Sequence, residues 1–353
     1  DLPTHARAFA TYDASRCAVL PALVDCHTHL VHGGDRIEAF CRRARGMTYA
    51  EIAEEGGGIV TTVRATRATS TDDLTSRARA ILARRHAQGI ATTEIKSGYG
   101  LESTEEIRML EVVERLAREG FDVEATLLAA HAVPRDIDRA EWIRQITDEL
   151  IPEVSRRKLA RFVDVFVERH AYTVDEAKKI FVAARAYGLR ARVHADQLTE
   201  CGGAALAAEV GATSADHLEH ANDDGIRAMA EAGVVATLLP GALTFLGDRA
   251  PKLGRVLVDA GVEIAIATDA NPGSSPTHNL PLMATLAVTQ MGLLAEEALR
   301  AITLGGAHAL ARSDIGSIVP GMRARLIVLD SSDSRALVAS FGEPIIKDMI
   351  VGG

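Results

Sequence analysis

Aromatic residues and cysteines are scarce in this chain, and long hydrophobic runs are absent. Phe, Tyr and Trp make up 4% of its 353 residues, which suits close-packed β/α layers better than an aromatic-rich binding module. The four cysteines, at positions 17, 26, 41 and 201, have no CxxC spacing, so we expect reduced, mostly buried thiols rather than a disulfide framework. No apolar run is long enough to span a membrane, and the first residues carry no signal-peptide pattern. We therefore expect a cytoplasmic protein without a membrane partner.

A basic excess is also absent. Lys and Arg number 39 against 48 Asp and Glu, which gives a net charge of -9. Binding to nucleic acid requires a basic surface, so we expect no nucleic-acid partner. Hydrophobic residues at 47% and charged residues at 25% are ordinary for a globular protein, and this composition excludes a wholly disordered chain.

Eight short apolar segments alternate with longer segments of helical period. The apolar segments lie at 17–30, 89–98, 122–131, 161–170, 189–197, 212–220, 233–240 and 261–269. Ser103-x-x-Glu106 and Thr173-x-x-Glu176 have the spacing of capping boxes, which mark helix starts. Alternation of this kind predicts parallel strands joined by helices, and eight units predict an α/β fold of the (β/α)₈ TIM-barrel type over residues 19–312. An open doubly wound sheet is the alternative.

The two ends of the chain do not fit this repeat. Residues 316–330 have a turn-rich β pattern, and strand-like sequence continues to residue 353. We expect residues 1–18 and 313–353 to form a small accessory β-sandwich domain. The long first connection contains Gly56-Gly57-Gly58, for which we expect a flexible lid, because no GK[ST] motif follows to indicate a phosphate loop.

Polar side chains gather at the predicted strand ends and favour the barrel over the open sheet. A barrel brings the carboxyl ends of all its strands to one face, where barrel enzymes have their active sites. In an open sheet the same residues would be spread along an edge. The residues concerned are His27, His29, Glu94, Lys96, His131, Glu168, His194, Asp196, His217 and Asp269.

The sequence Asp25-Cys26-His27-Thr28-His29 is the strongest sign of chemistry. Residues i and i+2 of a strand project to the same face, so both imidazoles can reach one metal ion while Cys26 points away. His194 and Asp269 follow two further predicted strands. Three His and one Asp form a ligand set suited to zinc or iron, so we expect one divalent metal ion held by His27, His29, His194 and Asp269.

Longer strings of sequence resemble a known family. HxH on the first strand, His on the fifth and Asp on the eighth resemble the metal-dependent amidohydrolase superfamily. The strings DCHTHLVHGGDR, EEGGGIVTTVRATR, EIKSGYGL, AAHAVP, VHADQL, SADHLEH and ATDANPGSS occur in this order and resemble the imidazolonepropionases of histidine degradation. That resemblance implies hydrolysis of the cyclic amide of 4-imidazolone-5-propanoate to N-formimino-L-glutamate, with one zinc or iron ion. It also implies a barrel with a β-sandwich built from both chain ends, and a homodimer.

The resemblance extends to individual residues. Asp269 would move a proton from water to the leaving nitrogen, and His217, rather than His220, would polarise the carbonyl or hold the water. An anionic propionate tail calls for a cation, and Arg36 follows the metal motif closely enough to bind it. The other substrate contacts that we expect are Tyr99, His131, Gln197, Asn271, Gly273 and Ser274.

Two departures from the family pattern leave alternatives open. His27 comes soon after the first residue, so we expect the accessory domain to be incomplete at its N-terminal side. Gln197 stands where some members have Glu, and an amide cannot act as a base. A deaminase or another cyclic amidohydrolase, or a metal-binding barrel without turnover, are therefore the competing hypotheses.

Overall fold

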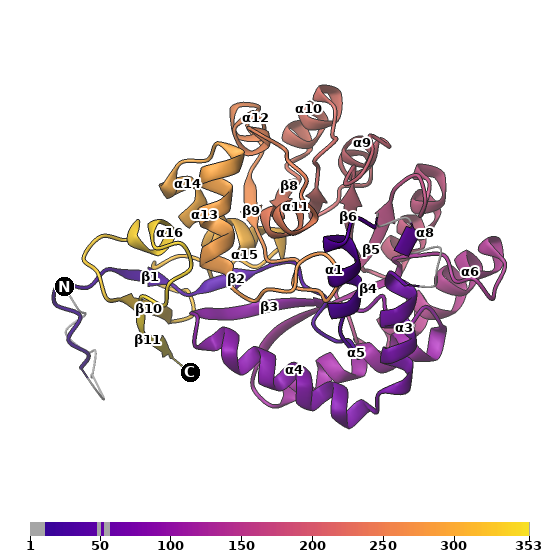
Figure 1. Ribbon diagram of the computed structural model, residues 1–353, viewed down its shortest axis with the longest axis horizontal. Coiled ribbons are helices and arrows are strands. Elements are labelled where there is room, and N and C mark those ends of the chain that lie inside the picture. Colours follow the sequence, from indigo (N-terminus) through magenta and orange to yellow (C-terminus); the bar gives the residue numbers. More distant parts are fainter. Residues whose placement is uncertain (1–10, 48–50, 53–56, 353) are drawn as a thin grey trace.

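The computed structural model describes residues 11–47, 51–52 and 57–352. Eight parallel strands form its central sheet in simple chain order, from β2 to β9 (Figure 1). The strands are β2 (Leu23–Asp25), β3 (Ile90–Lys96), β4 (Asp122–Ala130), β5 (Phe162–Val167), β6 (Arg190–Ala195), β7 (Ser214–His217), β8 (Val235–Leu238) and β9 (Ile264–Ile266). Each lies within one of the eight segments expected from the sequence.

The sheet curls until its first and last strands meet. Thr28, just beyond β2, forms a parallel bridge with Ala270, just beyond β9. Below this bridge, the Asp25 carboxylate accepts hydrogen bonds from the Thr268 amide at 3.1 Å and from the Thr268 hydroxyl at 2.5 Å. It is also paired with the buried guanidinium of Arg85. The expected (β/α)₈ barrel is therefore confirmed. We call the junction between β2 and β9 the seam of the barrel, and Asp25 joins its two sides.

Helices surround the barrel and bury the outer face of its strands (Figure 1). Every residue of β3 is buried, as is usual for a parallel strand covered on both sides. The helices of the first half are α1 (Ile37–Ala44), α3 (Ile59–Ala68), α4 (Thr71–His86), α5 (Ser103–Arg118), α6 (Arg139–Gln145), α7 (Ile151–Arg157) and α8 (Val174–Ala186). Those of the second half are α9 (Gly203–Val210), α10 (Asp223–Ala232), α11 (Pro240–Leu246), α12 (Leu253–Asp259), α13 (Leu280–Met291), α14 (Ala295–Arg300), α15 (Gly306–Ala309) and α16 (Ala336–Ala339). No helix in the described ranges is long and apolar enough to cross a membrane.

One of the two predicted capping boxes is present. Thr173 and Glu176 cap α8 reciprocally, as expected. The prediction for Ser103 and Glu106 is wrong, because the buried Glu106 carboxylate instead accepts hydrogen bonds from the amides of Gly98, Gly100 and Leu101 at 2.7–2.8 Å. Glu106 thus fixes the loop that follows β3 and carries Tyr99.

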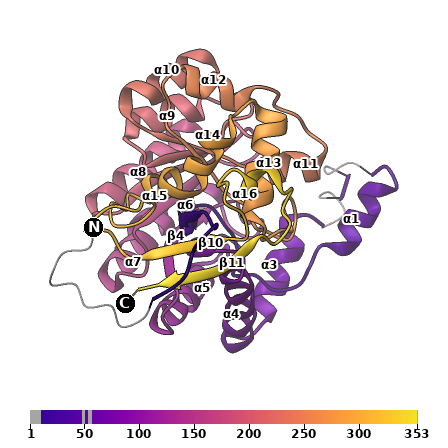
Figure 2. The ribbon, with the colours of Figure 1, turned by 90° about the vertical axis from the view of Figure 1, so that its left-hand side faces the viewer.

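Both chain ends contribute to a second, antiparallel sheet. Its order is β1 (Val19–Pro21), β10 (Arg325–Leu329) and β11 (Ile346–Val351), and Figure 2 shows β10 and β11 side by side near both termini. The expectation of an accessory β unit built from both ends is confirmed, but the predicted boundary at residue 19 is wrong, because Val19–Pro21 pairs with β10 and belongs to the accessory sheet. In the described residues it is a single three-stranded sheet, and Ala22 alone separates its strand β1 from the barrel strand β2.

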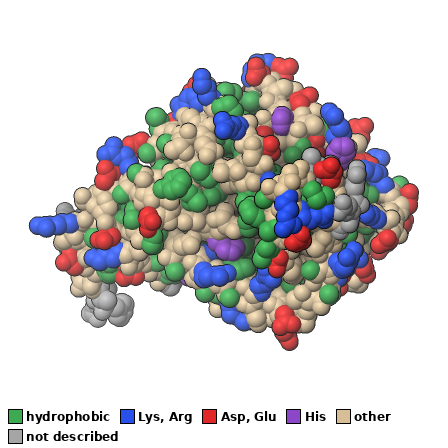
Figure 3. All heavy atoms as spheres, in the orientation of Figure 1, with side chains coloured by type: hydrophobic (Ala, Val, Ile, Leu, Met, Phe, Trp, Pro, Cys, Tyr) green, Lys and Arg blue, Asp and Glu red, His purple; other side chains and the backbone are tan. Residues whose placement is uncertain are grey.

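Charges of both signs are interspersed on the molecular face drawn in Figure 3. Ion pairs between exposed side chains also occur, as where Arg144 contacts Glu141 and Glu149 at 2.7 and 2.9 Å. Solvent screens such pairs, so each contributes little to stability. The apolar layer between the strands and the surrounding helices therefore provides most of the stability.

Candidate metal centre

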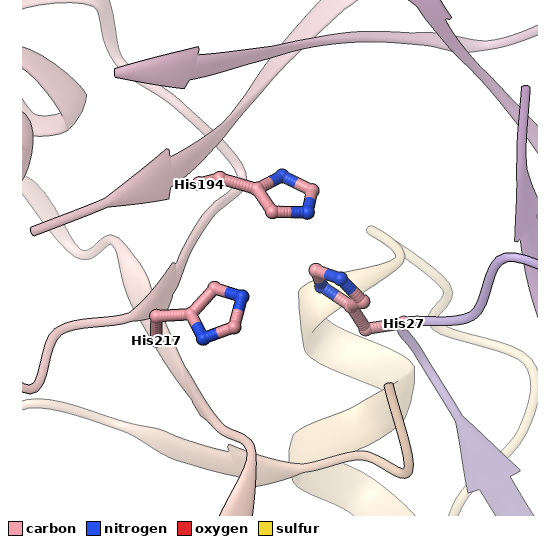
Figure 4. A group of neighbouring side chains, drawn as sticks. All are labelled: His27, His194 and His217. Carbon is pink, nitrogen blue, oxygen red and sulfur yellow. The ribbon is translucent and has the colours of Figure 1, made fainter. Parts of the chain in front are cut away.

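Three histidines from different strands point toward one another at the carboxyl end of the barrel (Figure 4). His27 follows β2, His194 lies on β6 and His217 ends β7. Their ring centroids are 4.5 Å apart for His27 and His194, and 5.4 Å apart for His194 and His217. All three side chains are buried.

His29 and Asp269 complete the cluster from the two sides of the barrel seam. His27 Nε2 lies 3.3 Å from His29 Nε2 and 3.6 Å from Asp269 Oδ1. His29 Nε2 lies 3.4 Å from the same carboxylate oxygen. Ligand atoms bound at about 2.0–2.1 Å to a tetrahedral zinc ion are about 3.3–3.4 Å apart, so these three atoms are spaced as metal ligands.

The tautomer of His27 strengthens this interpretation. His27 Nδ1 lies 2.7 Å from the ionised Asp216 carboxylate, so Nδ1 carries the proton and the Nε2 lone pair faces the cluster. That lone pair, His29 Nε2 and the Asp269 carboxylate are gathered around one point, where a cation would be attracted to all three. Within the described residues, two groups have the spacing of metal ligands, namely His27, His29 and Asp269, and His27, His194 and His217. The residues therefore fit a single divalent cation.

The charge states of these groups also suit a cation. Burial, together with the nearby Lys96 ammonium, holds the pKa of His27 well below its usual value, and burial lowers the pKa of His194. Neutral imidazole is the form that binds metal. Burial would raise the pKa of Asp269, but His29 and His27 outweigh it and the pKa is lowered. Asp269 is therefore a carboxylate at neutral pH.

His217 differs from the other histidines. Burial alone would lower its pKa, but Glu219, with Oε1 at 3.5 Å from His217 Nδ1, and Asp269 outweigh burial and raise the pKa. The raised pKa favours the protonated form of His217, which can donate a hydrogen bond or a proton to a substrate. The backbone φ of His217 is 80° and that of Asp269 is 49°, so both are held in the left-handed region that is often found at functional sites.

A cavity of about 1200 Å³ opens above the cluster. His29, His194, His217 and Asp269 lie in its wall, and the structure brings every substrate contact expected from the sequence to the same wall. Those residues are Arg36, Tyr99, His131, Gln197, Asn271, Gly273 and Ser274. The wall also contains residues that the sequence did not single out as substrate contacts, including Arg43, Arg135, Phe166 and Glu168.

Arg36 lines the cavity, and only the Nη1 end of its guanidinium is engaged by the described residues. Its Nη1 donates to the Gly58 carbonyl and, at 3.1 Å, to the Thr62 hydroxyl. Nη2 lies near Gly273, where a Cβ atom would be 3.9 Å away. Nε is buried without a hydrogen-bond partner among the described residues. The Nε–Nη2 edge can therefore take a carboxylate in bidentate fashion.

An aromatic wall and a polar turn enclose the rest of the cavity. His131 stacks on His29 with centroids 5.1 Å apart and lies 5.4 Å from Tyr99. The Asn271 side chain accepts from the amides of Gly273 and Ser274 at 2.8 Å and donates to the Asp269 carbonyl at 2.7 Å. Asn271 thus builds the turn beside Asp269, and little of its side chain is left to bind a substrate.

Some of the polar residues at strand ends turn away from the cavity. The Asp196 carboxylate accepts hydrogen bonds from the amides of Cys201, Gly203 and Ala204 and so fixes the start of α9. His220 is exposed, whereas His217 belongs to the cluster. Cys26 is fully buried among apolar side chains, as the alternation of the strand predicts.

Comparison with known proteins agrees with this geometry. The sequence model of the amidohydrolase family matches residues 18–353. Solved structures at low identity show the same fold. A guanine deaminase from C. acetobutylicum with bound guanine has a TM-score of 0.71 at 14% identity, over 99% of this chain and 90% of that one. An adenosine deaminase from Xanthomonas campestris with bound zinc has a TM-score of 0.67 at 19% identity, over 95% of this chain and 79% of that one.

A metal-competent His/Asp cluster at the carboxyl face of a (β/α)₈ barrel, joined to this match, defines the class: the chain belongs to the metal-dependent amidohydrolase family. Much closer relatives narrow the assignment. The imidazolonepropionase of Geobacillus kaustophilus is 45% identical over 97% of this chain and 81% of its own length. That of Clostridium tetani is 42% identical over 98% and 83%. Within the amidohydrolases, the chain belongs with the imidazolonepropionases.

Proposed function

We propose that this protein hydrolyses the cyclic amide of 4-imidazolone-5-propanoate to N-formimino-L-glutamate in histidine degradation, using one zinc or iron ion. The observation that carries the proposal is a single cavity that joins the metal-competent cluster to the free edge of Arg36. A small ring with an anionic tail needs both features. The 42–47% identity to curated imidazolonepropionases supports the same substrate.

The reaction requires a nucleophile, a polarised carbonyl and a proton for the leaving nitrogen. A divalent cation at His27, His29, His194 and Asp269 would make water a usable nucleophile by lowering its pKa to roughly 7. Either zinc or ferrous iron suits three imidazoles and one carboxylate. Asp269, ionised and in the cavity wall, accepts the proton of the attacking water and passes it to the leaving nitrogen. His217 donates a hydrogen bond to the carbonyl oxygen as negative charge develops there.

Substrate orientation falls to the opposite side of the cavity. The Nε–Nη2 edge of Arg36 holds the propionate, and Tyr99 and His131 form a wall against which the flat ring packs. The side-chain amide of Gln197 lines the cavity and has no hydrogen-bond partner among the described residues. It is therefore available to hydrogen-bond the ring, and it cannot serve as the base.

An assay with the metal-loaded protein tests the proposal. Hydrolysis is followed by the loss of absorbance of the imidazolone chromophore, and parallel reactions with guanine and cytosine are monitored for released ammonia. Turnover of the imidazolone alone is expected. Ammonia release from a nucleobase would favour a deaminase, and bound metal without any turnover would favour a binding protein. The homodimer and the cytoplasmic location stay predictions.

A further inference from the structure

Five charged side chains form a buried layer directly beneath the metal-competent cluster. They are Glu94 and Lys96 on β3, Asp164 on β5, Arg192 on β6 and Asp216 on β7, and all five are 0% exposed. We call them the buried charged layer. Burying a charged group is energetically unfavourable unless the group is well paired. The burial of five charged side chains therefore indicates a role other than stabilising the fold.

Lys96 is the centre of the layer. Its Nζ lies 2.8 Å from Asp164 Oδ2 and 2.9 Å from Glu94 Oε1, and 3.7 Å from Asp216 Oδ2. Arg192 reaches only one of these carboxylates, that of Asp216, at 3.0 Å. Among the described residues, Glu94 and Asp164 are paired with no other lysine or arginine. Lys96 is thus the cation on which two of the three carboxylates depend.

Two of these carboxylates contact metal-ligating histidines on the side away from the cluster. Asp216 Oδ2 is hydrogen-bonded to His27 Nδ1 at 2.7 Å. Asp164 Oδ2 lies 3.0 Å from His194 Nδ1, an ion-pair contact without hydrogen-bond geometry. The negative charge of a carboxylate beside Nδ1 favours the proton on that nitrogen and leaves the Nε2 lone pair for the cation. The same two oxygen atoms are those that face Lys96.

The third carboxylate holds the backbone between the two histidines of the HxH motif. Glu94 Oε2 accepts the Thr28 amide at 3.1 Å, and the Glu94 carbonyl accepts the Thr28 hydroxyl at 2.5 Å. Thr28 lies between His27 and His29, so its position sets the direction of both rings. Lys96 therefore lies beside all three of these carboxylates. Asp216 contacts His27, Asp164 contacts His194, and Glu94 holds the segment that joins His27 to His29.

We propose that Lys96 is a positioning residue for the metal site. Its ammonium holds Glu94 and Asp164 in place and adds to the positive charge that Arg192 provides beside Asp216. These carboxylates in turn set the tautomers and orientations of the proposed histidine ligands. The proposal rests on the metal site of the proposed function and not on the identity of the substrate.

The test is the zinc dissociation constant, measured by competition with a chelator, together with thermal unfolding of the metal-free protein. Lys96→Met removes the ammonium and keeps most of the stem. Lys96→Gln keeps an amide NH₂ that can donate to two carboxylates. Arg312→Met is the matched control. Arg312 bridges Asp122 and Glu124 at 3.3 and 2.9 Å, at the amino-terminal end of β4 and away from the cluster.

We expect Lys96→Met to bind zinc about 10–100-fold more weakly, the usual effect of losing support behind a ligand, and Lys96→Gln to fall in between. The Arg312→Met variant is expected to unfold at a lower temperature yet to bind zinc within about twofold of the parent. If Lys96→Met does not fold, Lys96→Gln and Asp164→Asn carry the test. Zinc affinity within twofold of the parent in both of these, or an equal loss in Arg312→Met, would overturn the proposal. Because no substrate is used, a failed imidazolone assay leaves this result interpretable.

Discussion

Replacing Arg36 by alanine tests the substrate assignment most directly. Nη1 is occupied by Gly58 and Thr62, and the Nε–Nη2 edge remains for a carboxylate. Hydrogen bonds to charged groups contribute about 1.5–3 kcal/mol each. Water replaces part of the lost contact in the variant, so we expect a net loss of about 3 kcal/mol for the bidentate pair, or roughly 150-fold in affinity.

The effect should appear in KM, because the tail is bound equally in the ground state and the transition state. The measurement is steady-state hydrolysis of the imidazolone at matched metal content. Arg36→Lys, which keeps the charge but not the fork, should recover only part of the affinity. Arg43→Ala and Arg135→Ala are controls, since both arginines line the same cavity. If the KM of Arg36→Ala equalled that of the parent while the KM of one control variant rose, the substrate carboxylate would bind elsewhere in the cavity. That result would refute the reasoning.

Three further substitutions address the metal and the proton transfers. His194→Ala should lose bound metal and activity together, which metal analysis and the hydrolysis assay would show; full occupancy with normal turnover would contradict the ligand set. His217→Ala should lower kcat by roughly 10²–10³-fold, as when one oxyanion donor is lost, with metal content as the check that the site is intact; an unchanged kcat would remove His217 from the mechanism. Gln197→Glu should be neutral or weaken binding, because it adds a carboxylate beside an anionic substrate, and activity found only in this variant would show that a base is needed at that position.

The barrel could be predicted from the sequence because the alternation of strand and helix segments is visible within short stretches of the chain. Parallel strands that are buried on both sides have apolar sequences, and the proposed metal ligands lie at or just beyond the ends of such strands. The His27–His29 spacing projects both rings to one face regardless of the remainder of the fold. These features depend on neighbours within a few residues, and the structure places them as expected.

Other features depend on contacts between distant segments and had no local signal. Glu106 has capping-box spacing, but its carboxylate is used by the loop around Tyr99. Asp196 ends a strand as Asp269 does, yet it turns toward α9 rather than into the cavity. Asp164 occurs within an apolar run, and nothing near it in sequence indicates that His194 lies 3.0 Å away. Alternation along β5 could have placed Asp164 inside the barrel, but it could not have identified His194 as its partner.

The seam of the barrel has a consequence for how the protein acquires its metal. Asp25 and Thr268, which join the seam, are 243 residues apart in the chain, and the proposed ligands His27 and Asp269 lie close to them in sequence. Contacts between such distant residues form late, because a long loop must close first. A chain emerging during synthesis can fold most of its β/α units without holding both halves of the ligand set. Tight metal binding therefore requires the last strand to dock on the first, and metal retention reports that folding is complete.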